Sequence, residues 1–207
     1  MSTISIIGTG NMARAIGALA VAGGNTVEII GRNQSKAADL AKALGGSATT
    51  GEFGAVPAGD IGIVSVLYAE VVPVVTQYGD ALAGKVIVDI SNPFNPTADG
   101  LAIPDDTSVA QEVAKAAPAS ASVVKAFNTI FGVVLAKGRP LDVFIVGDDA
   151  RAKAAVAEFI ESLKLRPLDV GALHMAHWLE GAGLIVMGLA NHGIGNFDFA
   201  LGASVPG

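Results

Sequence analysis

The chain places three small residues, Gly8, Gly10 and Ala13, at the spacing G-x-G-x-x-A directly after an apolar run. In such a turn the first glycine makes a tight bend, the second lets the backbone approach a pyrophosphate, and the third small residue lets a helix pack on the strand. The N-terminus of that helix offers free N–H groups to an anion. An ordinary glycine turn is the alternative, but the strand, turn and helix signals agree. The spacing therefore predicts a dinucleotide site with this cradle: Gly8, Thr9, Gly10, Asn11 and Met12.

Cations stand where the second predicted strand ends, in the stretch EIIGRNQSK. Enzymes that use NAD place a carboxylate there, on the ribose 2'-hydroxyl, but Glu28 lies mid-strand and no carboxylate stands at the strand end. Arg32 offers a planar fork for a phosphate, Lys36 adds a second charge, and Ser35 has a hydroxyl that can also cap the helix. Solvated surface charge is the alternative interpretation. The pattern favours NADP over NAD, held by Arg32, Asn33, Ser35 and Lys36.

The ends of three later predicted strands complete the predicted cleft, because ligands of open α/β sheets lie beyond the carboxyl ends of the strands. Two X-Pro steps in SNPFNP should hold one of these loops in extended or turn conformations, which suits a rigid wall beside a nicotinamide. Plain polar turns at strand ends are the alternative. The wall would comprise Ser65, Leu67 and Tyr68, then Ser91, Asn92 and Pro93, then Phe127, Asn128 and Thr129.

Residues that donate protons or bind metals are sparse. The chain has no cysteine and three histidines: His174 and His177 lie near the start of the last predicted helix, and His192 lies in a glycine-rich tail. Without a carboxylate or thiol at ligand spacing, we predict packing or surface roles for them and no metal site. No obvious Lys or His stands beside a strand end to protonate a substrate oxygen. Direct hydride transfer between two redox rings needs no such acid, because there the protein stacks the rings and excludes water.

Short apolar runs alternate with Ala-rich segments, which is the pattern of βαβ units. Continuous apolar strands such as IGIVSV require a sheet that helices cover on both faces. The predicted strands are Ile4–Ile7, Thr26–Ile30, Ile61–Val66, Lys85–Ile90, Ser122–Phe127, Val143–Val146 and Leu165–Val170. The predicted helices are Asn11–Val21, Ser35–Leu44, Glu70–Tyr78, Ser108–Ala116, Thr129–Ala136 and Ala150–Leu163.

These elements predict an α/β chain with a Rossmann-like, doubly wound and mostly parallel sheet. We expect an NADP-binding domain over residues 1–170. Residues 171–207 form a short C-terminal helical extension, with a helical stretch at Ala172–Ala190 and a glycine-punctuated tail. The extension is expected to fold back over the cleft or to pair with another chain.

Composition narrows the classes of partner. Of the 207 residues, 51% are hydrophobic and 15% are charged, which excludes disorder. The formal net charge of -6 argues against a nucleic-acid surface and favours a small-molecule partner. The apolar run Ala182–Ala190 is far too short to span a membrane. The N-terminus enters an apolar strand without a basic region or cleavage site, so we expect a cytoplasmic protein.

Several motifs occur together in an order that resembles a known family. GTGNMA, GRNQSK, DISNPFNP, VKAFNT and LRPLDVGAL followed by WLE are similar to segments of NADP oxidoreductases of the coenzyme F-420 dependent type. That group is related to the cytosolic reductase domain of the STEAP metalloreductases. The resemblance runs from Ile4 to about Asn196.

The resemblance implies a Rossmann-like domain and homodimers. It implies that NADP(H) binds at Thr9, Gly10, Asn11, Met12, Arg32 and Lys36, with the nicotinamide near Leu67, Asn92 and Asn128. It also implies that the C-terminal extension covers a cleft where a deazaflavin ring, that of coenzyme F-420, stacks on the nicotinamide.

The second substrate stays open between a deazaflavin and a flavin-like acceptor. Archaeal members have His-Thr-Ile where this chain has Asn128-Thr129-Ile130, and His177 stands where an Arg is usual. Coenzyme F-420 is a polyanion, and this chain has no basic cluster near its extension. Two further interpretations stay open. One is an NADP-binding redox sensor without catalysis. The other is an imine reductase like pyrroline-5-carboxylate reductase, because GTGNMARAI resembles the opening of that family.

Overall fold

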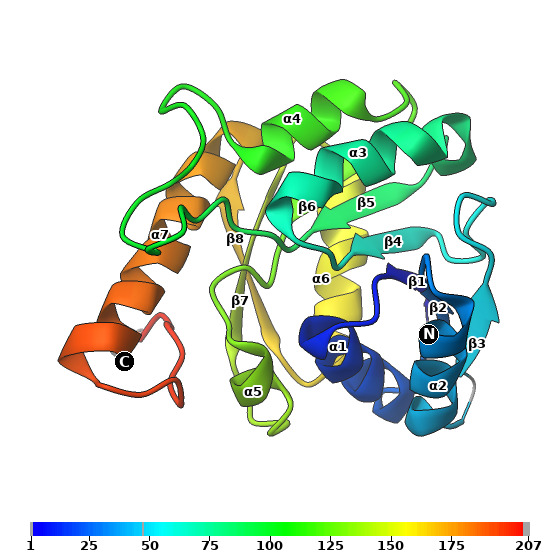
Figure 1. Cartoon of the computed structure of the whole chain (residues 1–207), viewed down its shortest axis with the longest axis horizontal. Coiled ribbons are helices and arrows are strands. Elements are labelled where there is room, and N and C mark those ends of the chain that lie inside the picture. Colours follow the sequence, from blue (N-terminus) through cyan, green and yellow to red (C-terminus); the bar gives the residue numbers. More distant parts are fainter. Residues whose placement is uncertain (1, 47, 205–207) are drawn as a thin grey trace.

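The computed structural model describes residues 2–46 and 48–204, and a single eight-stranded sheet organises them (Figure 1). The strand order is β3-β2-β1-β4-β5-β6-β7-β8. The first six strands pair in parallel and follow the order of dinucleotide-binding folds. The strands are β1 (Thr3–Ile7), β2 (Thr26–Ile30), β3 (Ala48–Gly51), β4 (Ile61–Val64), β5 (Val86–Asp89), β6 (Ser122–Lys125), β7 (Asp142–Gly147) and β8 (Arg166–Gly171). The predicted Rossmann-like, mostly parallel sheet is confirmed.

Helices cover both faces of the sheet, as the continuous apolar strands require. In Figure 1, α3 and α4 lie side by side above the sheet, and α1 and α2 lie below it. The helical elements are α1 (Asn11–Ala22), α2 (Gln34–Leu44), α3 (Tyr68–Tyr78), η1 (Gly79–Leu82), α4 (Val109–Ala116), α5 (Gly132–Leu135), α6 (Ala150–Ser162), η2 (Leu173–Met175), α7 (Ala176–Gly188) and η3 (Leu189–Gly193, a π turn).

Two hydrophobic cores lie on the two faces of the sheet. Neighbouring strand residues point to opposite faces, so in β1 the side chain of Ile6 joins one core and that of Ile7 joins the other. The first core contains Ile16 of α1 and Phe159 of α6, both fully buried. The second contains Val74 of α3 and residues of α4 and α7. The strands are thereby fixed between two helical layers, and their carboxyl ends are held in register.

Three elements differ from the prediction. Strand β3 was not predicted, because ATTG carries no apolar run and its two threonines are exposed at the sheet edge. The helix predicted over Thr129–Ala136 is only the short α5, and the chain before it includes Phe127, which has a positive φ of 60°. Strand β7 runs antiparallel to β6, so the chain after β6 turns back instead of crossing over.

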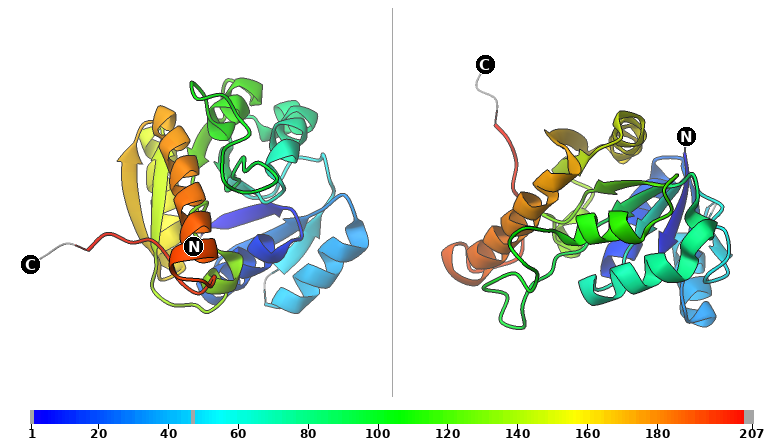
Figure 2. Two further views of the ribbon diagram at one scale, coloured as in Figure 1. Left: turned by 60° about the vertical axis from the view of Figure 1, so that its left-hand side comes forward. Right: turned by 90° about the horizontal axis from the view of Figure 1, so that it is seen from above.

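The C-terminal extension begins where β8 ends, at Gly171. Figure 2 shows α7 along the outside of the molecule, beside β7 and β8. The tail that follows packs Phe197 and Phe199 edge-on against Phe131, and Arg166 donates to the carbonyl oxygen of Ala203 at 2.6 Å. Within residues 2–46 and 48–204, no helix is long and apolar enough to cross a bilayer.

Candidate functional site

The turn after β1 has the geometry that the glycine spacing predicts. Gly8 has a φ of 136°, and a side chain there would collide with the carbonyl oxygen of Ser65 at the end of β4. Gly10 stands before the first turn of α1, and nothing lies within 4 Å of the position that its Cβ would take. Ala13 is fully buried under the helix. The open space at Gly10, before the first turn of α1, leaves room for a phosphate to approach the N-terminus of the helix.

A pocket of about 280 Å³ lies beside this turn, and we call it the Arg32 pocket. Nη1 of Arg32 lies 2.8 Å from Oε2 of Glu70, and its guanidinium lies 5.6 Å from the centre of the Phe53 ring. Lys36 lines the pocket too and forms no ion pair with a described residue. The lining comprises Ile7, Gly8, Thr9, Gly31, Arg32, Asn33, Lys36, Phe53, Ser65, Val66, Glu70 and Val74.

One prediction about this region was wrong. Helix α2 is capped by Asn33, whose Oδ1 accepts from the N–H of Lys36 at 3.0 Å, and Ser35 is exposed and outside the pocket. The end of β2 carries no carboxylate, but Glu70 brings one into the pocket from α3. Glu28 behaves as expected of a mid-strand residue: its Oε2 accepts from the Ala58 N–H at 2.9 Å.

A groove of about 360 Å³, the Gly10 groove, continues from the Arg32 pocket and shares Ser65 and Val66 with it. Its other lining residues are Gly10, Asn11, Met12, Leu67 and Ile90. Met12 and Ile90 also line the next pocket, so the hollows form one row along the carboxyl ends of the parallel strands.

The last hollow, the Asn128 pocket, has a volume of about 220 Å³ and no ionisable side chain in its lining. Nδ2 of Asn128 donates to Oδ1 of Asn92 at 2.9 Å and to the carbonyl oxygen of Leu179 at 2.7 Å. Nδ2 of Asn92 donates back to the carbonyl oxygen of Asn128 at 2.7 Å. The lining comprises Met12, Ile90, Asn92, Phe94, Phe127, Asn128, Thr129, Ile130, Phe131, Gly132, Gly183, Val186 and Met187.

The remaining predicted residues lie outside the three hollows. Tyr68 is the first residue of α3, and Pro93 is buried beside the loop. Ser91 belongs to a buried polar network. Nδ1 of His177 lies 2.8 Å from the carbonyl oxygen of Thr107, whereas His174 and His192 are exposed. Among the described residues, no group of three or more His, Cys, Asp or Glu is placed to hold a metal ion.

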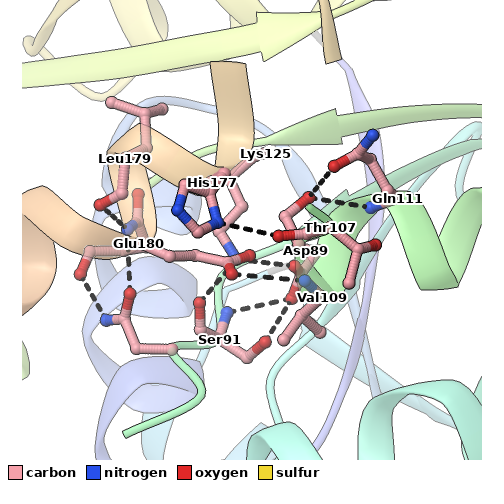
Figure 3. A network of polar contacts seen from close by, with 12 residues as sticks. Asp89, Ser91, Thr107, Val109, Gln111, Lys125, His177, Leu179 and Glu180 are labelled. Atoms are coloured by element: carbon pink, nitrogen blue, oxygen red, sulfur yellow. Dashed lines mark hydrogen bonds and ion pairs between the residues drawn. The ribbon is translucent and has the colours of Figure 1, made fainter. Parts of the chain in front are cut away.

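Sequence reasoning missed four residues that shape the site. Phe53 and Glu70 reach the Arg32 pocket from elements other than the motif, and Gly183 lines the Asn128 pocket from α7. Lys125 ends β6, is fully buried and lines none of the three hollows, so it does not contradict the prediction that no lysine stands ready to protonate a substrate oxygen. It lies between Asp89 and Glu180 (Figure 3). A charge at the end of an apolar strand, as in SVVK and VIVD, was the signal that could have found this cluster.

Comparison with known proteins finds a family model, curated relatives and solved structures that match this chain. Residues 3–93 match the model of the family described as NADP oxidoreductase, coenzyme F420-dependent. The chain is 33% identical over 181 residues to metalloreductase STEAP3 of Rattus norvegicus, covering 86% of this chain and 35% of that protein. It is 31% identical over 140 residues to the F420-dependent NADP reductase of Methanocaldococcus jannaschii, covering 63% of this chain and 62% of that protein. The chain thus spans less than two thirds of either relative.

A solved structure from Arthrobacter sp. FB24, provisionally described as an F420-dependent NADP reductase, shares the fold with a TM-score of 0.84 at 23% identity. The match covers 98% of this chain and 100% of that one. The hypothetical protein SMa0349 from Sinorhizobium meliloti matches with a TM-score of 0.75 at 30% identity, over 84% of this chain and 86% of that one.

Proposed function

We propose that this chain, a member of the coenzyme F420-dependent NADP oxidoreductase family, binds NADPH and transfers hydride between it and a flavin-like or deazaflavin ring. One observation carries the proposal: a cationic pocket, an open glycine turn and an uncharged apolar pocket form one row at the carboxyl ends of the strands. The order of polarity along the row matches that of a dinucleotide followed by a second ring.

The cationic end fits the phosphates of NADP(H). Arg32 and Lys36 would hold the 2'-phosphate, with Asn33 at the start of α2 beside them. The N–H groups above Gly10, together with Thr9, Asn11 and Met12, would hold the pyrophosphate. We assign no contact to Ser35, because it is exposed outside the pocket.

The other end of the row would hold the reacting rings. Bound NADPH supplies a hydride, and a flavin-like acceptor takes that hydride together with a proton from solvent. The chain's own residues would orient the two rings and exclude water from them. Ser65 and Leu67 line the Gly10 groove that leads to the Asn128 pocket. Asn92 and Asn128 form the polar side of that otherwise apolar pocket. A lining without charge favours an uncharged ring and offers no cation for a polyanionic tail. Riboflavin-like and deazaflavin rings are therefore the acceptor class that we propose.

We also propose that the protein is a homodimer joined through α7. Trp178 and Ile185 lie seven residues apart on this helix, with exposures of 66% and 60%. A helix that is apolar on all sides is usually buried, and exposed apolar patches mark interaction surfaces. The small residue Ala182 between them would let a second copy approach closely.

The test is NADPH oxidation with a panel of acceptors: riboflavin, FMN, coenzyme F420, its deazaflavin ring without the anionic tail, a ferric chelate and pyrroline-5-carboxylate. We expect turnover with the ring compounds, the tail-free deazaflavin serving at least as well as the full coenzyme. Tight NADPH binding without turnover of any acceptor would instead indicate a redox sensor. Turnover confined to pyrroline-5-carboxylate would indicate an imine reductase.

A further inference from the structure

A buried ion cluster joins helix α7 to the ends of β5 and β6 (Figure 3). Nζ of Lys125 lies 2.8 Å from Oδ2 of Asp89 and 2.7 Å from Oε1 of Glu180. The same ammonium group donates to the carbonyl oxygen of Ser91 at 2.7 Å. All three charged side chains are fully buried. Asp89 ends β5, Lys125 ends β6 and Glu180 lies within α7, so one cation joins three elements.

The carboxylate oxygens of the cluster are all occupied. Oδ1 of Asp89 accepts from the N–H and the hydroxyl of Ser91, at 2.9 and 2.7 Å. Oε2 of Glu180 accepts from the N–H of Val109, the first residue of α4, at 3.2 Å. Burial raises the pKa of Glu180, and Lys125 offsets part of that rise. Apolar side chains often replace buried ion pairs without loss of stability. A contribution to stability therefore explains the buried cluster poorly, and its position in the fold points more directly to its role.

The cluster ties together two walls of the Asn128 pocket. Ser91 precedes Asn92, which lines the pocket from the loop after β5. Glu180 follows Leu179, whose carbonyl oxygen accepts from Asn128. One turn further along α7, a Cβ on Gly183 would lie 2.7 Å from Oδ1 of Asn92, so helix and loop are in close contact. The ammonium group thus fixes the loop by its backbone and the helix by its carboxylate.

We infer that Lys125 is a positioning residue, which sets the separation between the Ser91–Asn92 loop and α7 and thereby the width of the Asn128 pocket. The inference rests on the proposed function, because the acceptor ring would lie in that pocket. Lys125, Asp89 and Glu180 do not line the pocket themselves, and none of them lines the Arg32 pocket. Loss of the cation is therefore expected to impair use of the acceptor and to spare binding of NADPH.

Two variants test the inference. Lys125→Met removes the cation but leaves two buried carboxylates, which can prevent folding. The triple variant Asp89→Asn, Lys125→Met, Glu180→Gln removes all three charges at nearly constant size. The control is Lys85→Met. Lys85 directly precedes β5, its side chain is 17% exposed, and its Nζ lies 3.6 Å from Oδ1 of Asp60. We expect the triple variant to keep the NADPH Kd within about twofold and to lose about tenfold or more in acceptor kcat/KM. The control should change neither.

Amide hydrogen exchange gives a readout that does not depend on turnover. In the triple variant, exchange should rise in residues 90–95 and 176–188 and stay unchanged in residues 31–36. If kcat/KM of the folded variant and these exchange rates match the wild type, even with a lowered melting temperature, Lys125 is only structural and the inference is overturned. If the wild type turns over no acceptor, the proposed function fails, while the exchange pattern still decides whether Lys125 positions the two walls.

Discussion

At the scale of single residues, the Arg32 pocket contains cations that would attract a phosphate and a carboxylate that would compete with it. Arg32 and Lys36 are the groups that would bind a phosphate, but Arg32 already contacts Glu70, and both side chains of that pair are partly exposed, at 58% and 46%. Exposed ion pairs contribute little free energy. A doubly charged phosphate would therefore displace Glu70 from the guanidinium at a small cost. The same carboxylate would lower the affinity for NADPH relative to a pocket without it.

Arg32→Ala is expected to raise the Kd for NADPH by roughly 10- to 150-fold, because a hydrogen bond to a charged group is worth about 1.5–3 kcal/mol. The Kd for NADH, which lacks the phosphate, should change little. Glu70→Gln is the matched variant of opposite sign, and it should tighten NADPH by about 1.5- to 5-fold. Calorimetric titration of both nucleotides measures these effects. Equal weakening of NADPH and NADH in Arg32→Ala would contradict the assignment.

The residues predicted from the sequence were those that a local motif fixes. Gly8, Gly10 and Arg32 follow from a turn and a strand end, so neighbours in the chain are enough to place them. Glu70 and Lys125 could not be placed in that way, because their partners are 38 and 55 residues away, in other elements. Ser35 was assigned a cap that Asn33 makes, since either side chain can accept at a helix start and the choice depends on where the first turn closes.

At the scale of elements, the close contact between α7 and the loop after β5 depends on a glycine. Gly181 and Gly183 lie in the same helix, but only the second faces a neighbour within 4 Å. Gly181→Ala is expected to stabilise the protein by about 0.5–1 kcal/mol through helix propensity. Gly183→Ala should be destabilising by about 1–2 kcal/mol, because its new methyl group pushes Asn92 out of place.

Urea unfolding of the two alanine variants measures the difference. Acceptor KM should also rise in Gly183→Ala and not in Gly181→Ala, because Asn92 lines the pocket. Equal stabilisation by both substitutions would show that the loop yields freely, and would argue against a pocket of fixed width.

The long periodic elements were predictable, and the short irregular ones were not. Helices α1 and α6 and the apolar strands follow their periodicity closely. Strand β3 is held by pairing with β2 instead of by its own apolar residues, and α5 is only a single turn long. The direction of β7 depends on how the chain packs after β6, which no local pattern encodes.

At the scale of the whole molecule, the exposed face of α7 predicts the state of assembly. We expect the protein to sediment as a dimer, and Trp178→Glu with Ile185→Asp to sediment as a monomer, because a charge on a buried apolar interface is costly. Val56→Asp, at an apolar residue that is 68% exposed elsewhere, is the control and should remain dimeric. A wild type that sediments as a monomer would rule out the interface.

The tail meets the body at Ala203, which contacts both Arg166 and Asp142, and we expect this contact to depend on pH. Nε and Nη2 of Arg166 donate to Oδ1 and Oδ2 of Asp142, each at 2.6 Å. This guanidinium holds the pKa of Asp142 below its ordinary value of 3.8. A lowered folded-state pKa adds stability above the ordinary value, and that stability is lost as pH falls through the lowered one. Asp142→Asn should therefore destabilise the protein at pH 7.

The stability difference between wild type and Asp142→Asn should shrink as the pH falls below 3.8, and urea unfolding at several pH values follows it. Asp60→Asn, at a side chain that is 93% exposed, is the control and should leave stability nearly unchanged. A stability difference between wild type and Asp142→Asn that is the same at neutral and acid pH would show that the contact acts through packing and not through charge.

Trp178 is the one tryptophan of the sequence, and it lies on the exposed face of α7 with the ring of His177 edge-on beside it at 5.2 Å. The protein thereby carries a built-in fluorophore at the surface proposed to join two copies. Indole emission shifts to shorter wavelength when water is excluded from the ring. Dilution of the unlabelled protein, followed by its emission maximum alone, would therefore report when α7 is covered and when it is bare.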